Sequence, residues 1–202
     1  MTLVKVCGIC DAASAAAAVE AGADLLGFHF CSSLRRVTAA EARAIVDSLP
    51  GRRPEIVGVF IDQSPAEVAE IAEEVSLDRV QLHGSELPSF AAPRPPIKAL
   101  KVRDGLIPDA DPWPDPILLD SWSSDQRGGT GQAWDWELAR PLLATRQVIV
   151  AGGLNPENVR DVVERYRPYG VDVSSGVESR PRVKDPALVR AFVAAVREAD
   201  GR

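Results

Sequence analysis

Eight short β-rich runs, separated by segments of helical character, constrain the fold of this 202-residue chain more than any other feature. Strands and helices that alternate to the end of a chain favour right-handed crossovers and a parallel sheet. The same alternation fixes the order of the elements along the chain. The predicted strands are Leu3–Cys7, Asp24–Phe30, Glu55–Ile61, Arg79–Leu82, Ile97–Val102, Pro116–Asp120, Gln147–Val150 and Gly170–Val173.

The segments between these runs mix Ala, Leu, Val and charged residues at helical spacing. Thr38, Ser64, Asn155 and Asp185 are N-cap residue types, and proline follows the last three directly. Three prolines within Arg103–Asp115 leave room there only for a short or distorted helix. The predicted helices are Ala12–Ala21, Ala39–Leu49, Pro65–Val75, Trp136–Leu143, Pro156–Tyr166 and Pro186–Ala199.

Eight β/α units predict an α/β protein with a single domain, residues 1–202, folded as an eight-stranded parallel (β/α) TIM barrel. An open, doubly wound sheet is the alternative, since alternation alone does not distinguish the two. No Gly-x-Gly-x-x-Gly turn follows the first run, where a dinucleotide-binding sheet would carry it. The barrel is therefore favoured.

Composition narrows the class of partner. The net charge of −6 argues against non-specific nucleic-acid binding, which needs a clustered excess of Lys and Arg. No apolar run approaches the roughly 20 residues of a membrane span, and the first residues contain no basic leader or apolar signal core. We expect a cytoplasmic protein that binds neither nucleic acid nor membranes. Three cysteines make a disulfide framework improbable.

Two glycine-rich and serine-rich turns follow the last two predicted strands. Ala151–Leu154 and Ser174–Val177 each separate a strand from a helical segment, so unpaired backbone N–H groups face outward there. The loops after strands seven and eight of such barrels commonly bind phosphate. We predict a phosphate cup, with ordinary turn glycines as the alternative; its residues are Gly152, Gly153, Ser175 and Gly176.

Reactive side chains in these barrels stand at the carboxyl ends of strands. Cys7 ends the first predicted strand and Asp120 ends the sixth. A cysteine there can also be a small buried hydrophobe. A carboxylate at the end of an apolar strand is harder to explain structurally, because burying it without a partner is costly.

The chain resembles the phosphoribosylanthranilate isomerases, barrel enzymes of tryptophan biosynthesis. Matching segments occur in the order of the family and span nearly the whole sequence. They are Val4–Ile9, Leu26–Phe28, Val57–Phe60, Val80–Gly84, Leu118–Asp120, Gly128–Gly131, Trp134–Trp136, Ala151–Val159 and Asp172–Glu178.

The resemblance implies an Amadori rearrangement of N-(5-phosphoribosyl)anthranilate, an aldose-to-ketose isomerisation. An acid protonates the ring oxygen and opens the sugar to a Schiff base, and a base then takes the proton from C2. The resemblance assigns Asp120 as the acid and Cys7 as the base. Neither a metal nor an organic cofactor is called for by this chemistry.

Further residues are expected around the substrate. The anthranilate carboxylate requires a cation, which the resemblance places at Arg35 or Arg36, with two solvated arginines as the alternative. Gly129 belongs to a glycine-rich loop suited to a closing flap, or else to a rigid turn. The remaining substrate contacts are expected at Gln81, His83 and Asp172, His83 being a structural histidine in the alternative.

Lys5 lies two residues before Cys7 on the same strand face, deeper in the barrel. We therefore expect a structural ion pair for Lys5 and no assistance to the thiol. Cys10 forms a Cys-x-x-Cys spacing with Cys7, which suggests that oxidation could join the two and silence the base.

Two other functions remain open. The related histidine-pathway isomerases rearrange a larger substrate with two phosphates, but they resemble one another in carrying aspartate where this chain has Cys7. A phosphate-binding scaffold without catalysis would tolerate replacement of Cys7 and Asp120. The expected partner is a phosphorylated small molecule, and the expected assembly is a monomer or a homodimer.

Overall fold

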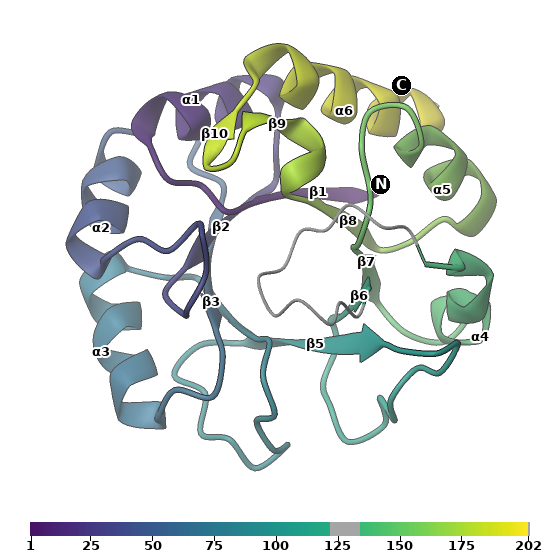
Figure 1. Ribbon diagram of the computed structural model, residues 1–202, viewed down its shortest axis with the longest axis horizontal. Coiled ribbons are helices and arrows are strands. Elements are labelled where there is room, and N and C mark those ends of the chain that lie inside the picture. Colours follow the sequence, from purple (N-terminus) through teal and green to yellow (C-terminus); the bar gives the residue numbers. More distant parts are fainter. Residues whose placement is uncertain (122–133, 202) are drawn as a thin grey trace.

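The computed structural model describes residues 1–121 and 134–201, and its centre is a closed barrel of parallel strands in chain order (Figure 1). Pairing of β1 with β8 closes the ring, which rules out the open, doubly wound sheet. The predicted fold class is confirmed. The strands are β1 (Leu3–Cys7), β2 (Leu25–His29), β3 (Glu55–Phe60), β4 (Arg79–Leu82), β5 (Pro96–Val102), β6 (Ile117–Ser121), β7 (Val148–Val150) and β8 (Gly170–Val173).

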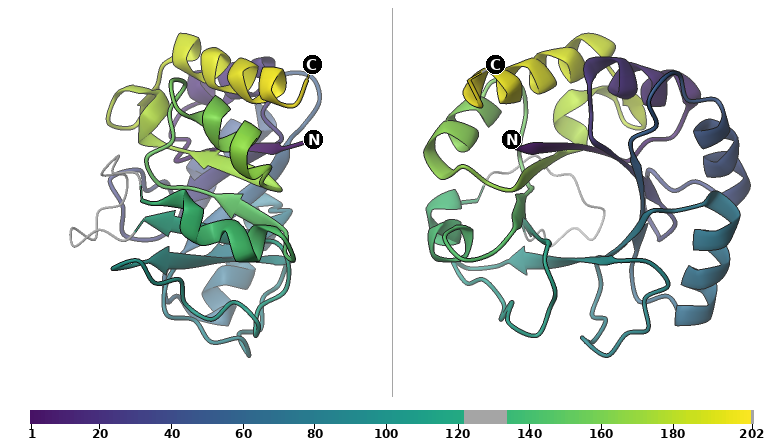
Figure 2. Two further views of the ribbon diagram at one scale, coloured as in Figure 1. Left: turned by 90° about the vertical axis from the view of Figure 1, so that its right-hand side faces the viewer. Right: turned by 180° about the vertical axis from the view of Figure 1, so that it is seen from behind.

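Helices surround the ring except beside β5, where loops border it (Figures 1 and 2). The stretch 103–115 forms turns and no helix, so the short fifth helix considered for it is absent. Its prolines remove backbone donors that a helix would need. The helices are α1 (Ala12–Ala21), α2 (Ala39–Asp47), α3 (Pro65–Val75), η1 (Trp136–Ala139), α4 (Arg140–Leu143), α5 (Val159–Tyr166) and α6 (Pro186–Ala199).

Side-chain caps fix most helix starts at the predicted residues. Thr38 and Ser64 each form a capping box, and Asp185 accepts two backbone N–H groups of α6. Asn155 behaves differently, because its side chain accepts the N–H groups of Glu157 and Asn158 and closes a turn before α5. The helix therefore begins three residues later than predicted, at Val159.

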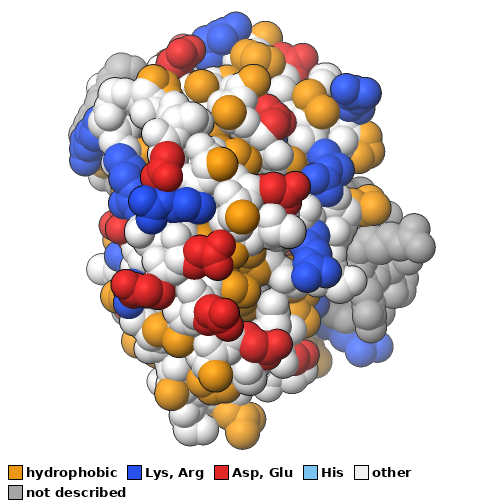
Figure 3. All heavy atoms as spheres, turned by 90° about the vertical axis from the view of Figure 1, so that its left-hand side faces the viewer, with side chains coloured by type: hydrophobic (Ala, Val, Ile, Leu, Met, Phe, Trp, Pro, Cys, Tyr) orange, Lys and Arg blue, Asp and Glu red, His pale blue; other side chains and the backbone are white. Residues whose placement is uncertain are grey.

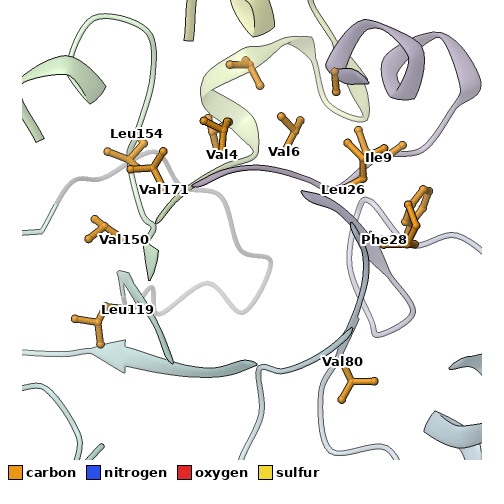
Figure 4. Close-up of a cluster of buried hydrophobic side chains, with 14 of the residues drawn as sticks. Val4, Val6, Ile9, Leu26, Phe28, Val80, Leu119, Val150, Leu154 and Val171 are labelled. Carbon is orange, nitrogen blue, oxygen red and sulfur yellow. The ribbon is translucent and has the colours of Figure 1, made fainter. Parts of the chain in front are cut away.

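Alternation along each strand separates two cores. Val4, Val6, Phe28 and Leu119 point away from the ring toward the helices (Figure 4). Their chain neighbours consequently face the barrel interior, which contains a second apolar cluster. The members of this inner cluster are Leu25, Val57, Ile97, Ala99, Leu118, Ile149 and Ala151.

A small antiparallel hairpin after β8 was not predicted. It consists of β9 (Glu178–Arg180) and β10 (Val183–Lys184), and the 3-10 turn η2 (Ser175–Val177) precedes it. Arg182 adopts a φ of 75° in the hairpin turn. Its guanidinium donates to the carbonyl oxygens of Leu34 and Arg36, which ties the hairpin to the loop after β2.

Acidic and basic side chains are interspersed on the side of the molecule formed by α1, α2 and α3 (Figure 3). A groove of about 490 Å³ between α2 and α3 is lined by such residues near the amino ends of the strands. Its charges are paired with one another, as in Arg43 with Asp47 and Arg53 with Asp78. This groove lies at the end of the barrel opposite to the strand carboxyl ends.

None of the helices in the described part of the chain has the length and apolar character needed to cross a membrane.

Candidate active site

The carboxyl ends of the strands direct a set of polar side chains into one mouth of the barrel. Val6 and Leu119 face outward, so Cys7 and Asp120, which follow them, face inward (Figure 4). Because all strands are parallel, their carboxyl ends share one rim. The inward residues near this rim include Cys7, His29, Gln81, Asp120 and Asp172.

The Cys7 thiol is buried among three polar groups. Its sulfur lies 3.3 Å from His29 Nε2, and the Lys5 ammonium, which binds Asp172 at 3.0 Å, is a second hydrogen-bond partner. Burial and the charge of Asp172 raise the pKa of the Cys7 thiol, whereas Lys5 opposes this rise. The net effect is a rise, so the thiol is predominantly protonated at neutral pH.

The predicted ion pair of Lys5 is present, but the expectation that Lys5 cannot assist the thiol is wrong. The long side chain of Lys5 extends along the barrel interior toward Cys7, and the missing side chain of Gly27 leaves space for it. A Cβ at Gly27 would lie 2.7 Å from Cys7 Sγ and 3.2 Å from Lys5 Nζ. Although the Lys5 backbone lies deeper in the barrel than Cys7, its side chain is long enough to bring the ammonium group to the level of the thiol.

Asp120 is held by a polar chain from β4. The Gln81 amide donates to His83 Nδ1 at 2.9 Å, which leaves Nε2 as the nitrogen that faces Asp120 Oδ2 at 3.4 Å. His83 and Gln81 therefore orient the carboxyl from β4, across β5, at the rim of the mouth. About a quarter of the Asp120 side chain remains exposed, so a substrate atom can reach it.

Asp172 lies between the two candidate catalytic groups. Burial raises the pKa of the Asp172 carboxyl, the ion pair with Lys5 lowers it, and the nearby Asp120 raises it. The charge on Asp172 also acts on the Cys7 thiol. The carboxyl of Asp120 and the sulfur of Cys7 thus belong to one electrostatic cluster across the mouth.

The two predicted phosphate-binding turns lie side by side. A Cβ at Gly176 would clash with the carbonyl oxygen of Leu154, so the turn after β8 packs directly on the turn after β7. Gly152 and Gly153 both have positive φ values, 86° and 73°, which only glycine adopts without strain. Within the described residues, no acceptor receives the backbone N–H groups of Gly152, Gly153, Ser175 or Gly176.

Both catalytic candidates border this cup. A Cβ at Gly152 would lie 3.0 Å from Asp120 Oδ1, and a Cβ at Gly8, directly after Cys7, would lie 3.0 Å from Ser174 Oγ. The turn after β7 therefore touches the acid, and the turn after β8 touches the segment that carries the thiol. A phosphorylated sugar held in the cup would extend between these two groups.

The two candidate arginines have different environments. Arg35 is 5% exposed and forms a bidentate ion pair with Glu178, both bonds being 2.7 Å. Lys184 also binds Glu178 at 3.0 Å. Burial raises the pKa of the Glu178 carboxyl, but the hydrogen bonds and charges of Arg35 and Lys184 hold it below its usual value. Arg36 is exposed on the same loop.

Cys7, Cys10 and Cys31 are free thiols in the structure. Cys10 Sγ donates to the carbonyl oxygens of Gly8 and Arg35, whereas Cys7 Sγ faces His29. The proposed oxidative link between Cys7 and Cys10 stays a prediction. Gly129 lies outside the described residues.

No group of three His, Cys, Asp or Glu side chains is arranged to hold a metal ion in the portion of the chain that the structure describes.

Sequence reasoning assigned no role to His29 or Glu178. His29 ends β2 on its inward face, whereas the predicted strand extended to Phe30, so the scan of predicted strand ends did not reach it. Glu178 contacts Arg35 across 143 positions of sequence, and no local pattern announces such a pair.

Comparisons with known proteins agree with this geometry. The sequence model of the family described as "PRAI: N-(5'phosphoribosyl)anthranilate (PRA) isomerase" matches residues 4–195. An N-(5'-phosphoribosyl)anthranilate isomerase of Desulforudis audaxviator is 45% identical and aligns over 98% of this chain and 100% of that relative.

Two solved structures show the same fold. Phosphoribosyl anthranilate isomerase from Thermus thermophilus has a TM-score of 0.88 and 41% identity, covering 98% of this chain and 99% of that one. A second phosphoribosyl anthranilate isomerase was solved in complex with reduced 1-(o-carboxyphenylamino)-1-deoxyribulose 5-phosphate. It has a TM-score of 0.82 and 35% identity, covering 98% of this chain and all of that one.

Proposed function

Because the chain belongs to the N-(5'-phosphoribosyl)anthranilate isomerase family, it catalyses the Amadori rearrangement of tryptophan biosynthesis, and we propose that Asp120 and Cys7 carry out its proton transfers. The substrate is N-(5'-phosphoribosyl)anthranilate and the product is 1-(2-carboxyphenylamino)-1-deoxyribulose 5-phosphate. The observation that carries the assignment is the position of both groups beside one phosphate cup.

Asp120 acts first, as the general acid. Its carboxyl gives a proton to the furanose ring oxygen while the bond between that oxygen and C1 breaks. The nitrogen lone pair forms the C1=N bond of the Schiff base. Contact with His83 holds the carboxyl in place, and its exposed edge faces the mouth.

Cys7 acts second, as the general base. The thiolate takes the proton from C2, and the electron pair of the broken C–H bond forms the C1–C2 double bond. The electrons of C1=N return to nitrogen, so the enolamine is neutral and tautomerises to the ketone. The substrate gains one proton from Asp120 and loses one to Cys7, so no electrons leave it. Exchange with solvent then returns a proton to Asp120 and removes one from Cys7, and acid–base groups suffice for the reaction.

The phosphate group is held by the cup of Gly152, Gly153, Ser175 and Gly176. The free N–H groups there support this assignment, since a dianion can accept several of them at once. The cup fixes one end of the substrate and leaves the sugar between Asp120 and the thiol. The reacting carbons are thereby oriented without covalent attachment.

Replacing Gly176 with Ala should raise KM for the phosphorylated substrate by about tenfold, with a smaller change in kcat. A Cβ there collides with the Leu154 carbonyl and pushes apart the two turns of the cup. Steady-state kinetics and inhibition by inorganic phosphate measure the effect, and thermal unfolding reports on the fold. An unchanged KM in a folded variant would contradict the placement of the phosphate.

The loop after β2 supplies the cation for the anthranilate carboxylate. Arg35 is fixed at the mouth by Glu178 and packs over Gly8, and Arg36 is exposed beside it. The position of Arg35 next to the thiol segment supports Arg35 over Arg36 for this contact. Glu178 keeps this guanidinium in one orientation before the substrate arrives.

The remaining assignments concern the domain and the residues around Asp120 and Cys7. We assign residues 1–202 to one domain, with Gln81 and His83 supporting the acid and Asp172 acting between the acid and the base. The cytoplasmic location and the choice between a monomer and a homodimer stay predictions. So does the flap role of Gly129.

A fluorescence assay of substrate consumption tests the proposed function directly. The purified protein, treated with a chelator and given no organic cofactor, is expected to consume freshly formed N-(5'-phosphoribosyl)anthranilate. The bis-phosphorylated substrate of the histidine-pathway isomerases is the matched control, and we expect no turnover of it because the chain builds one phosphate cup. A folded protein inert toward both substrates would leave only the scaffold alternative.

A further inference from the structure

His29 lies between the Cys7 thiol and the loop that carries the candidate arginines. Its Nε2 is 3.3 Å from Cys7 Sγ, and its Nδ1 is 2.9 Å from Ser33 Oγ. Leu26 and Phe28 point outward, so His29, the last residue of β2, points into the mouth (Figure 4). Cys7 pairs with Gly27 in the sheet, which makes His29 the next residue on the same inner face.

The Ser33 hydroxyl favours the tautomer of the imidazole that carries its proton on Nε2. The backbone N–H of Arg35 donates to Ser33 Oγ at 3.0 Å, which occupies one lone pair of that oxygen. The hydroxyl hydrogen remains available to donate to His29 Nδ1. The ring proton then resides on Nε2 and faces the sulfur of Cys7.

Burial and nearby positive charges keep the His29 ring neutral. Burial lowers the pKa of His29 well below its usual range, and the positive charge of Lys5 lowers it further. His83, Arg35 and Lys184 act in the same direction. A neutral ring has one N–H, so the tautomer set by Ser33 decides whether the sulfur meets a donor.

We propose that His29 is a positioning residue for the reaction, which holds the Cys7 sulfur and stabilises its thiolate through an Nε2–H donor fixed by Ser33. The inference deepens the proposed function, because it rests on the assignment of Cys7 as the base. When Cys7 accepts the C2 proton it becomes a thiol. His29 Nε2 remains in contact with the sulfur and holds it in place through the whole cycle.

The thiolate needs the His29 donor because Lys5, its other hydrogen-bond partner, does not compensate its charge fully. The Lys5 ammonium also binds Asp172, so its charge is shared between a carboxylate and the thiolate. Lys184, the other cation that favours the thiolate, binds Glu178. A buried thiolate whose cations are each shared with a carboxylate is poorly compensated. A second donor, charge-assisted once the sulfur ionises, supplies the missing stabilisation.

The test compares four variants of the full chain. His29→Leu removes the donor, His29→Gln keeps an amide N–H, and Ser33→Ala releases the imidazole ring from its hydrogen bond. Ser32→Ala is the matched control. Ser32 is exposed on the same loop and touches none of these groups. Alkylation of Cys7 by iodoacetamide is followed against pH by peptide-resolved mass spectrometry, which separates Cys7 from the other two thiols. The pH profile of kcat/KM is recorded in parallel.

We expect Cys7 in His29→Leu to be alkylated about tenfold more slowly at pH 7, with the profile moved about one pH unit upward. kcat/KM at pH 7 should fall by a similar factor and recover as the pH rises, which a merely structural defect would not do. His29→Gln and Ser33→Ala should show smaller shifts, and Ser32→Ala none.

An unchanged alkylation profile in folded His29→Leu, or in Ser33→Ala if the leucine variant does not fold, would overturn the inference, even if Cys7→Ala abolished turnover. A shifted profile together with full turnover by Cys7→Ala would have the opposite meaning: the contact between His29 and the thiolate would stand, and the assignment of Cys7 as the base would fail. The two proposals are thereby tested separately.

Discussion

We expect the replacement of Asp120 with Asn to lower turnover by roughly 10²-fold or more, while the barrel stays folded. The amide has nearly the same shape as the carboxylic acid but no proton of comparable acidity. Ring opening therefore loses its acid, whereas the cup that binds phosphate is unchanged. The measurement is kcat at saturating substrate, with thermal unfolding as the check on the fold.

Asp161→Asn is the matched control for this change. Asp161 is exposed in the first turn of α5, far in the sequence from the strand ends, and the same chemical replacement there should leave turnover at the parent value. Parent-like turnover by Asp120→Asn would mean that another group donates the proton. His83, at 3.4 Å from the carboxyl, would then be examined first.

Replacing Cys7 with Ala is expected to cost a comparable factor, 10²-fold or more in kcat, because no thiolate remains to take the C2 proton. Burial raises the pKa of the Cys7 thiol, so the ionised fraction grows as the pH rises. The parent enzyme should accordingly gain activity with increasing pH on the limb that reports this group. The alanine variant should lack that limb at every pH.

Cys31→Ala supplies the control for loss of a thiol. Cys31 packs in the same small cluster as Cys7, and its pKa, raised mainly by burial to about 11, keeps it protonated. Turnover should change little when it is removed. If Cys7→Ala works at the parent rate, the base must be sought elsewhere.

The pH dependence of Cys7 has a definite physical origin. Cys7, Lys5 and Asp172 form a compact group in which one cation serves two anions once the thiol ionises. Every change that removes positive charge or a hydrogen-bond donor from this group disfavours the thiolate. The rate is therefore sensitive to residues that never touch the substrate.

Local sequence was sufficient for most of the barrel. The strand Leu3–Cys7 and the helices Ala12–Ala21 and Pro65–Val75 begin and end as predicted, because periodicity and caps act within a few residues. Asn155 shows the limit of this reasoning. Its residue type is right for a cap, but the turn it closes delays the helix to Val159.

Contacts between distant strands could not be read in the same way. The reach of Lys5 to the thiol depends on the absent side chain of Gly27, which stands opposite Cys7 only in the observed register. The pair of Arg35 with Glu178 likewise requires the hairpin after β8 to fold back over the loop after β2.

The sequence by itself determined the eight-stranded architecture, the two glycine-containing turns that we propose bind phosphate, and the two strand ends that carry Cys7 and Asp120. These features depend on residue type and on spacing within one unit of the repeat. The tertiary structure alone decided which groups surround the thiol and the carboxyl, including His29 and His83. The reason is that barrel closure and strand register set distances across the mouth, and those distances depend on all eight strands at once.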